Sequence, residues 1–227
     1  MSVSKKDVIV NIEASGVIPV FYHADMDVLL RVLSICYQCG LRVFEFMQQR
    51  DNKGLRFFEH LAERLDEFPG LTLGVGTVLD AAMAERYIAA GAHYIASPFL
   101  RKDMGLVCGK DRVIWMPGCA TFVEIEDAEQ LGATVINVLP GNVLGVDFIA
   151  TVKKQHRSLH LIPSGITDFK EKELIRWFEV GILALKVSTQ VFTKEDISAK
   201  DWSKIEKNLT ELLRNIKKAQ SILNLTT

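Results

Sequence analysis

Short apolar runs alternate with longer amphipathic segments along the chain. The runs are rich in β-branched and aromatic residues, a composition typical of strands that are buried on both faces. Between the runs, apolar residues recur every three or four positions, which predicts helices. The eight predicted strands lie within residues 17–23, 42–48, 71–78, 93–98, 112–118, 134–140, 159–165 and 182–188.

Helical patterns fill the gaps between these runs, and a longer one follows the last run. Gly40, Gly91, Gly132 and Gly181 lie where four of these helices should end, since a left-handed glycine commonly closes a helix. The N-terminal stretch MSVSKKDVIVNIEASG predicts an additional amphipathic helix before the first strand. Residues 189–202 are interpreted as an irregular segment that leads into the C-terminal helix.

The order of these elements predicts an α/β fold. Strands that alternate with helices pair in parallel through right-handed crossovers. Eight such units fit a (β/α)₈ TIM barrel with an extra N-terminal helix, formed by residues 1–227 as a single domain. The alternative is an open, doubly wound sheet, whose G-x-G-x-x-G motif is expected after the first strand. The chain reads VFYHADMD there, and GVGTVL after the third strand lacks the last glycine, so the sequence favours the barrel.

Composition narrows the classes of partner and location. The formal net charge is −1, so no excess of positive charge indicates nucleic acid or a membrane surface as a partner. No run approaches the roughly 18 consecutive apolar residues of a membrane span. Four cysteines are too few to crosslink a chain of this length, and we expect a reduced, cytoplasmic protein. Cys36 and Cys39 form a C-x-x-C motif inside a helical pattern, without a second pair for zinc, and we interpret them as ordinary thiols.

A barrel forms its ligand site at the C-terminal ends of its strands and in the loops that follow. Glu45 lies between Phe44 and Phe46, where a carboxylate is desolvated and suits general acid/base chemistry; the alternative is a structural ion pair. The histidines show no metal-ligand spacing, and we expect no metal and no cofactor. His23 is the one histidine at a strand end. The remaining polar residues at these ends are Gln48, Gln49, Arg50, Thr77, Ser97, Asn137, Ser164, Lys186 and Ser188.

Lys186 lies in the last predicted strand, on the same face as Ser188. Three roles are open to it: a Schiff-base nucleophile, a cation that holds a carboxylate or phosphate, or a side chain that reaches solvent. Ser164 and Gly165 belong to an SGI turn, where backbone N–H groups can bind an anion. Asn137 interrupts the apolar run TVINVLP, and a buried amide must find hydrogen-bond partners.

Several segments resemble, in order and spacing, the 2-keto-3-deoxy-6-phosphogluconate (KDPG) / 4-hydroxy-2-oxoglutarate (KHG) aldolase family. They are GVIPVFY, GLRVFEFMQQR, LTLGVGTVLD, AAGAHYIASPFL, VIWMPGCATFVEI, GATVINVLPGNVLG and LIPSGI. The resemblance implies a TIM barrel, a homotrimer and class I aldol cleavage, a carbon–carbon lyase reaction. The implied products are pyruvate and either glyceraldehyde 3-phosphate or glyoxylate. The implied partner is therefore a small-molecule keto acid or sugar-acid phosphate.

The resemblance also implies roles for individual residues. Glu45 matches the general acid/base of the family, and Thr77 matches a threonine that contacts the substrate. Further substrate-binding positions fall on Pro98, Ser164, Gly165 and Ser188.

Three features depart from the family pattern. The Schiff-base lysine of a motif like F-K-F-F-P falls on Asn137, whose amide nitrogen is not nucleophilic because its lone pair is delocalised into the carbonyl. The arginine that holds the pyruvyl carboxylate falls on Gln49, and the adjacent Arg50 would point to the opposite face of the strand. The T-G-G-I phosphate loop is shortened to SGI, and Lys186 replaces a glycine before Ser188.

Three functions are compatible with this pattern. The first is a lyase in which Lys186 acts as a relocated Schiff-base residue beside Glu45, which requires the two side chains to converge across the barrel mouth. The second is an inactive or repurposed paralogue, in which Asn137 donates a hydrogen bond to a bound keto acid, sugar acid or phosphate. The third is enolisation by Glu45 without a covalent step, as in an isomerase or decarboxylase.

Overall fold

The computed structural model describes residues 4–49 and 53–224, so Arg50 lies outside the described residues. Every predicted apolar run contains a strand. The fifth run is divided into two strands at Pro117, because proline has no N–H to donate to a neighbouring strand. The strands are β1 (Val17–Phe21), β2 (Val43–Met47), β3 (Thr72–Gly76), β4 (Tyr94–Ala96), β5 (Ile114–Met116), β6 (Gly118–Cys119), β7 (Val135–Val138), β8 (His160–Pro163) and β9 (Leu185–Val187).

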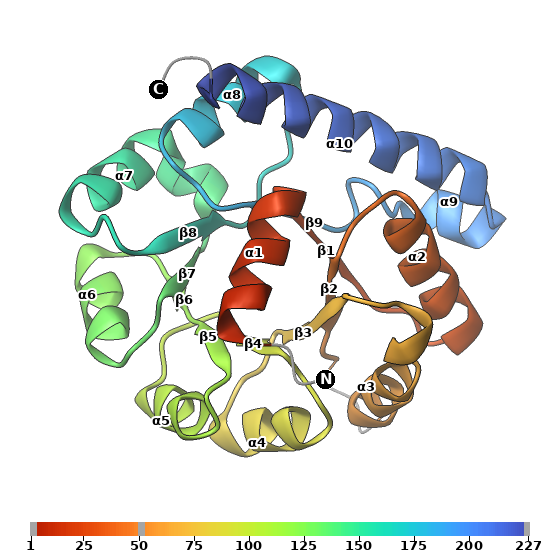
Figure 1. Ribbon diagram of the computed structural model, residues 1–227, viewed down its shortest axis with the longest axis horizontal. Helices are drawn as coiled ribbons and strands as arrows, with labels where there is room; N and C mark the ends of the chain where they lie inside the picture. Colours follow the sequence, from red (N-terminus) through yellow and green to blue (C-terminus); the bar gives the residue numbers. More distant parts are fainter. Residues whose placement is uncertain (1–3, 50–52, 225–227) are drawn as a thin grey trace.

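The strands pair in parallel in two groups, and hydrogen bonds connect the groups. One sheet has the order β5-β4-β3-β2-β1-β9, and the other has the order β6-β7-β8. The Asn137 N–H donates to the Pro117 carbonyl at 2.9 Å, and the Leu183 N–H donates to the Leu161 carbonyl at 2.9 Å. The result is a parallel α/β fold whose strands curl around a common centre, as Figure 1 shows.

Helices surround the strands, and the predicted helical segments are confirmed (Figure 1). Gly40, Gly91, Gly132 and Gly181 all adopt positive φ, between 81° and 96°, just beyond the ends of α2, α4, α6 and α8. The helices are α1 (Lys5–Ser15), α2 (Met26–Gln38), α3 (Gly54–Glu63), α4 (Ala81–Ala89), α5 (Lys102–Lys110), α6 (Phe122–Gln130), α7 (Gly141–Gln155), α8 (Glu171–Glu179), α9 (Lys194–Ala199) and α10 (Trp202–Asn224), with a 3₁₀ turn at Leu65–Glu67.

Two segments differ from their predicted form. The segment 189–202, expected to be irregular, contains α9, which begins where the Thr193 side chain accepts a hydrogen bond from the Asp196 N–H. Helix α7 begins at Gly141, earlier than its apolar pattern indicates, because a short first turn is joined to the main helix at a kink. Gly145 forms this kink with φ 76° and ψ 176°. Both additions are too short to produce a helical period in the sequence.

Helix α1 lies across the N-terminal ends of the strands and leads through Gly16 into β1 (Figure 1). Its Val8 and Ile12 are buried among the inward-facing side chains of the strands. The Asn11 amide donates to the Gly70 carbonyl at 3.0 Å and to the Thr72 hydroxyl at 2.9 Å. These contacts close one end of the sheet, so a ligand site is left to the opposite, C-terminal end.

Strand β2 divides its side chains between two apolar regions, as the two-residue period of a strand requires. Phe44 and Phe46 pack outward, with the cluster that joins strands to helices. Val43 and Met47 pack inward, with the cluster enclosed by the strands. Glu45 therefore faces the interior, and it is only 3% exposed. The strand places a carboxylate on the enclosed face of the sheet.

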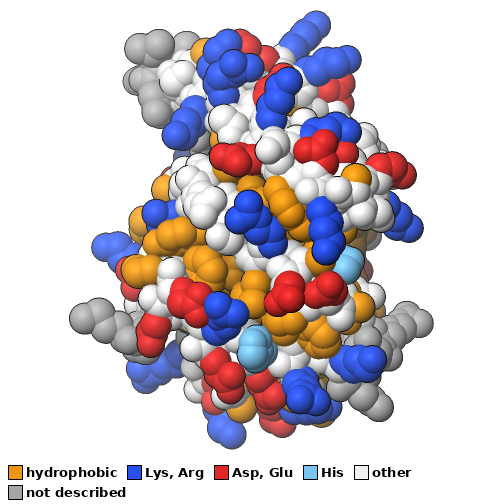
Figure 2. Space-filling model, turned by 90° about the vertical axis from the view of Figure 1, so that its right-hand side faces the viewer, with side chains coloured by type: hydrophobic (Ala, Val, Ile, Leu, Met, Phe, Trp, Pro, Cys, Tyr) orange, Lys and Arg blue, Asp and Glu red, His pale blue; other side chains and the backbone are white. Residues whose placement is uncertain are grey.

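The surface carries charges of both signs. Figure 2 views the molecule from the side of α2, α3 and α9, and Lys and Arg side chains are interspersed there with Asp and Glu side chains. Among residues 4–49 and 53–224, we find no helix with both the length and the apolar character needed to span a membrane.

Candidate active site

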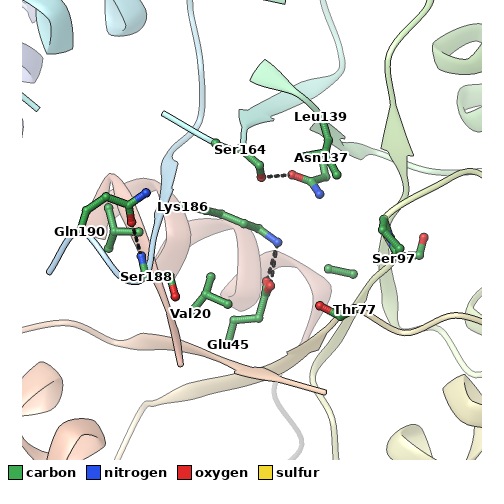
Figure 3. A pocket seen from close by; sticks show the side chains of 14 residues that line it. Val20, Glu45, Thr77, Ser97, Asn137, Leu139, Ser164, Lys186, Ser188 and Gln190 are labelled. Atoms are coloured by element: carbon green, nitrogen blue, oxygen red, sulfur yellow. Dashed lines mark hydrogen bonds and ion pairs between the residues drawn. The ribbon is translucent and has the colours of Figure 1, made fainter. Parts of the chain in front are cut away.

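A pocket opens at the C-terminal ends of the strands, opposite α1 (Figure 3). It collects side chains from β2, β7 and β9 and from the loops that follow β3, β4, β8 and β9. All the site residues expected from the sequence line this pocket except Gln49. They are Glu45, Thr77, Pro98, Asn137, Ser164, Gly165, Lys186 and Ser188.

The pocket contains a buried ion pair between Lys186 and Glu45. The Lys186 Nζ atom lies 2.9 Å from Glu45 Oε1 and 2.7 Å from Glu45 Oε2. The lysine and glutamate side chains are 10% and 4% exposed. Lys186 comes from β9 and reaches across β1 to β2, so its side chain points into the pocket and not to solvent. The structure thus brings the two expected catalytic groups together, although 141 residues separate them in the sequence.

Two glycines of β3 leave the space that the interior groups occupy. A Cβ atom on Gly76 would lie 2.1 Å from Glu45 Oε1, and a Cβ atom on Gly74 would lie 2.1 Å from Tyr94 Cζ. Gly74 is paired in register with Glu45 on one side and with Tyr94 on the other. Any larger residue at either position displaces an interior side chain, so the two glycines are required for this arrangement of the carboxylate and the phenol ring.

We expect Gly74→Ala to destabilise the protein by about 1–3 kcal/mol, because the ring it would displace is fully buried and has no free space to enter. Thermal unfolding measures this as a fall in Tm of about 2–4 °C for each kcal/mol. Gly109→Ala is the matched control, since Gly109 lies in α5 and a Cβ atom there meets no atom within 4 Å. A Gly74→Ala variant as stable as the Gly109→Ala variant would contradict the packing argument.

Tyr94 lies in the interior beside Glu45. Its side chain is fully buried, and its hydroxyl makes no hydrogen bond within the described part of the chain. Burial, then the charge of the neighbouring Glu45 carboxylate, and then the approach of the hydroxyl to that carboxylate raise the pKa of the phenol well above its usual value. An unpartnered buried hydroxyl costs about 1–3 kcal/mol. The sequence gives little sign of this residue, because tyrosine at the start of a short apolar run is ordinary for a strand.

Asn137 finds the hydrogen-bond partner that its place in an apolar strand requires. The Ser164 hydroxyl donates to Asn137 Oδ1. This bond orients the amide, and Figure 3 shows its nitrogen directed toward the space between Lys186 and Thr77. Asn137 therefore presents N–H donors to the pocket. An amide in this position can hold a carbonyl or carboxylate oxygen of a ligand.

Gln190 bridges the two loops at the other side of the pocket (Figure 3). Its side-chain oxygen accepts a hydrogen bond from the Ser188 N–H at 2.9 Å, and its side-chain nitrogen donates to the Ile166 carbonyl at 3.3 Å. The Ser188 N–H is therefore occupied by the protein itself. Sequence reasoning missed Gln190 because it lies in the segment interpreted as irregular, where no strand period marks the direction of side chains.

Other residues singled out in the sequence as candidate ligand contacts or reactive thiols do not line the pocket. The Gln49 amide donates to the Met47 carbonyl at 3.4 Å, and His23 Nδ1 accepts a hydrogen bond from the Asp25 N–H at 3.0 Å. Cys36 and Cys39 are free thiols, and burial raises the pKa of both. Across the described ranges, no group of three or more His, Cys, Asp or Glu side chains could hold a metal ion.

Comparison with protein families gives a match over most of the chain. The model of the family described as "Aldolase: KDPG and KHG aldolase" matches residues 8–208. Among curated proteins, the chain is similar to a 2-dehydro-3-deoxy-phosphogluconate aldolase of Treponema pallidum, with 30% identity over 108 residues, 47% of this chain and 51% of that protein. A protein of the same name from Zymomonas mobilis is 28% identical over 102 residues, 44% of this chain and 49% of that protein. The chain thus spans about half the length of these curated relatives.

Solved structures show the same fold. A KDPG aldolase from Legionella pneumophila, crystallised with pyruvate captured as a covalent carbinolamine intermediate, aligns with a TM-score of 0.76 and 20% identity, over 90% of this chain and 97% of that one. A KDPG aldolase from Zymomonas mobilis aligns with a TM-score of 0.76 and 23% identity, over 89% of this chain and 94% of that one. At these identities the similarity concerns the fold.

Proposed function

Because the chain belongs to the KDPG and KHG aldolase family, we propose that it is a carbon–carbon lyase that cleaves a 2-keto acid through a Schiff base on Lys186. The observation that carries the proposal is the position of the Lys186 amine, 2.7 Å and 2.9 Å from the two oxygens of Glu45 inside the pocket. A primary amine beside a carboxylate that can exchange protons with it is the minimal pair for this chemistry.

In the proposed reaction, Glu45 accepts a proton from the Lys186 ammonium, and the amine attacks the C2 keto carbon. A proton of the attacking nitrogen moves to the former keto oxygen and gives the carbinolamine. Its hydroxyl then takes the proton held by Glu45 and leaves as water, which gives an iminium ion. Glu45 then removes the proton of the C4 hydroxyl while the C3–C4 bond breaks, and the electron pair moves into a C2–C3 enamine as the aldehyde leaves. Glu45 returns the proton to C3, and water hydrolyses the iminium to release pyruvate.

The remaining pocket residues would bind the substrate. The Asn137 amide, fixed by Ser164, would donate to the carboxylate or the keto oxygen. Thr77, Pro98, Gly165 and Ser188 line the pocket around this point and would contact the rest of the keto acid.

Reductive trapping tests the proposal. Wild-type protein incubated with pyruvate and sodium borohydride should gain the mass of one reduced pyruvyl group, and peptide mapping should place it on Lys186. A protein that stays unmodified, or is modified at another lysine, would refute the Schiff base at Lys186.

A second candidate function is binding without cleavage. It is favoured by Asn137, which occupies the middle of β7 and carries an amide that cannot form a Schiff base. In that case thermal unfolding should show stabilisation by keto acids or sugar phosphates with no trapped adduct. Deuterium exchange into the methyl group of pyruvate without an adduct would instead indicate enolisation by Glu45.

Gln190 bears on whether the substrate is phosphorylated, since loops after the last two strands of such barrels often bind phosphate. Because Gln190 occupies the Ser188 N–H, Gln190→Ala should free this donor. We expect the variant to bind inorganic phosphate about tenfold more tightly than the wild type, or about 1.4 kcal/mol. Calorimetry measures the affinities, with Gln190→Glu as the control that should bind phosphate less tightly. Equal phosphate affinity in the wild type and Gln190→Ala would show that Gln190 does not limit this site.

We also propose that the strands close into an eight-stranded barrel, with β5 and β6 as one strand interrupted at Pro117. Two hydrogen bonds support closure: Asn137 donates to Pro117, the residue that joins β5 to β6, and Leu183, just before β9, donates to Leu161 of β8.

A homotrimer is the proposed assembly. Apolar side chains are exposed on α5, α6 and α7 and on the loop before α5, and these helices are neighbours in Figure 1. Such exposure is typical of an interface. We expect light scattering to give the mass of three chains, and Val123→Asp to give monomers with an unchanged fold; a monomeric wild type would contradict this. The exposed residues are Phe99, Leu106, Phe122, Val123 and Val143.

A further inference from the structure

Glu45 lies midway between two side chains that approach it from opposite directions. Across the sheet order β4-β3-β2-β1-β9, Lys186 comes from two strands away on one side and Tyr94 from two strands away on the other. Lys186 crosses over β1 to reach the carboxylate. Tyr94 crosses over β3 at Gly74, the residue in register with both Glu45 and Tyr94.

These two neighbours differ in what they donate. Lys186 bonds both oxygens of Glu45, whereas the Tyr94 hydroxyl has no hydrogen-bond partner within the described residues. Other buried polar side chains near the pocket are paired: the Trp115 indole N–H donates to Ser97, and Ser164 donates to Asn137. A fully buried hydroxyl without a partner, aimed at the interior beside a carboxylate, indicates a bond that forms in another state of the site.

We propose that Tyr94 is a positioning residue whose hydroxyl donates to Glu45 once the Lys186 amine has left the carboxylate. The proposal rests on the function proposed above, in which the amine bonds to the substrate carbon. Glu45 then loses its resting partner while it still has to remove and return a proton. A hydroxyl on the opposite side would hold the carboxylate in the same place through these steps. The raised pKa of the phenol keeps it protonated and therefore able to donate.

A double-mutant cycle measures this exchange of partners directly. Thermal unfolding is compared for the wild type, Tyr94→Phe, Lys186→Met and the double variant. In the wild-type background, Tyr94→Phe should leave Tm unchanged or raise it, since the hydroxyl it removes is unpaired. In the Lys186→Met background, where Glu45 has lost its cation, the same change should lower Tm by about 2–4 °C. Equal effects in both backgrounds would overturn the proposal.

Tyr87→Phe is the matched control for loss of a buried phenol hydroxyl. Tyr87 is also buried, but its hydroxyl donates to Gln48. Its effect on Tm should be the same with and without Lys186.

If the Lys186→Met variant does not fold, the proposal is tested by kinetics in the Tyr94→Phe variant alone. Tyr94→Phe should slow deuterium exchange into pyruvate about tenfold, while the extent of borohydride trapping at Lys186 is unchanged. An exchange rate equal to that of the wild type would overturn the role of Tyr94. A wild type that is not trapped at all would refute the Schiff base on Lys186, whereas equal effects of Tyr94→Phe in the two backgrounds or an unchanged exchange rate would refute the role of Tyr94, so the two failures are distinguishable.

Discussion

Replacing Lys186 with arginine is expected to abolish covalent trapping of pyruvate while keeping a cation beside Glu45. Guanidinium is always protonated and is not a nucleophile, yet it pairs readily with a carboxylate. We expect cleavage of the 2-keto acid to fall on the order of 10⁴-fold or more, as for loss of a catalytic nucleophile. The measurements are borohydride trapping and the rate of pyruvate release.

Comparing Lys186→Met with Lys186→Arg separates the effect of losing the amine from the effect of losing the ion pair. It removes the cation and leaves the Glu45 carboxylate buried, which costs about 3–5 kcal/mol. Lys186→Arg should therefore unfold near the wild-type temperature and Lys186→Met well below it, although both lack the amine. Trapped pyruvate in either variant would place the Schiff base on another lysine.

Glu45→Gln is expected to have the second large effect, a loss of proton transfer to and from the substrate. Glutamine has nearly the same shape, so the space above Gly76 still accommodates it, but an amide cannot accept or return the transferred proton. Deuterium exchange into pyruvate should slow by about 10²–10⁴-fold. Trapping at Lys186 should be slower but should still occur, because the amine remains in place although Glu45 no longer takes its proton. A normal exchange rate would show that another group moves the proton; loss of trapping together with exchange would mean that Glu45 acts mainly by holding Lys186.

The strands could be predicted from the sequence because strands buried on both faces must be apolar along their whole length. The direction of Glu45 and Lys186 follows from the same period of two residues. Their contact could not be predicted from it, because periodicity identifies a face of a strand but not the neighbouring strand. The pair meets only because β9 is hydrogen-bonded to β1. A pairing between the first and last strands leaves no local mark in the sequence.

Gln49 and Tyr94 show two further features of the site that the sequence pattern could not predict. The period of β2 assigns Gln49 to the face of Glu45, but the strand ends at Met47, and the Gln49 amide donates to the Met47 carbonyl and does not line the pocket. Tyr94 has the composition of any buried strand, and its place beside Glu45 depends on the missing side chain of Gly74. The effect of a glycine on a residue two strands away is visible only in three dimensions.

The separation of Asn137 and Lys186 onto β7 and β9 has a stereochemical consequence. An amine on β9 enters the pocket from an edge strand of one sheet, whereas an amine on β7 would enter from the other sheet, while Glu45 stays on β2. In the proposed reaction, a substrate tethered from β9 would present a different side of its enamine plane to the carboxylate. The facial selectivity of proton return, readable from the chirality of a methyl group labelled with all three hydrogen isotopes, is therefore expected to depend on which strand carries the amine.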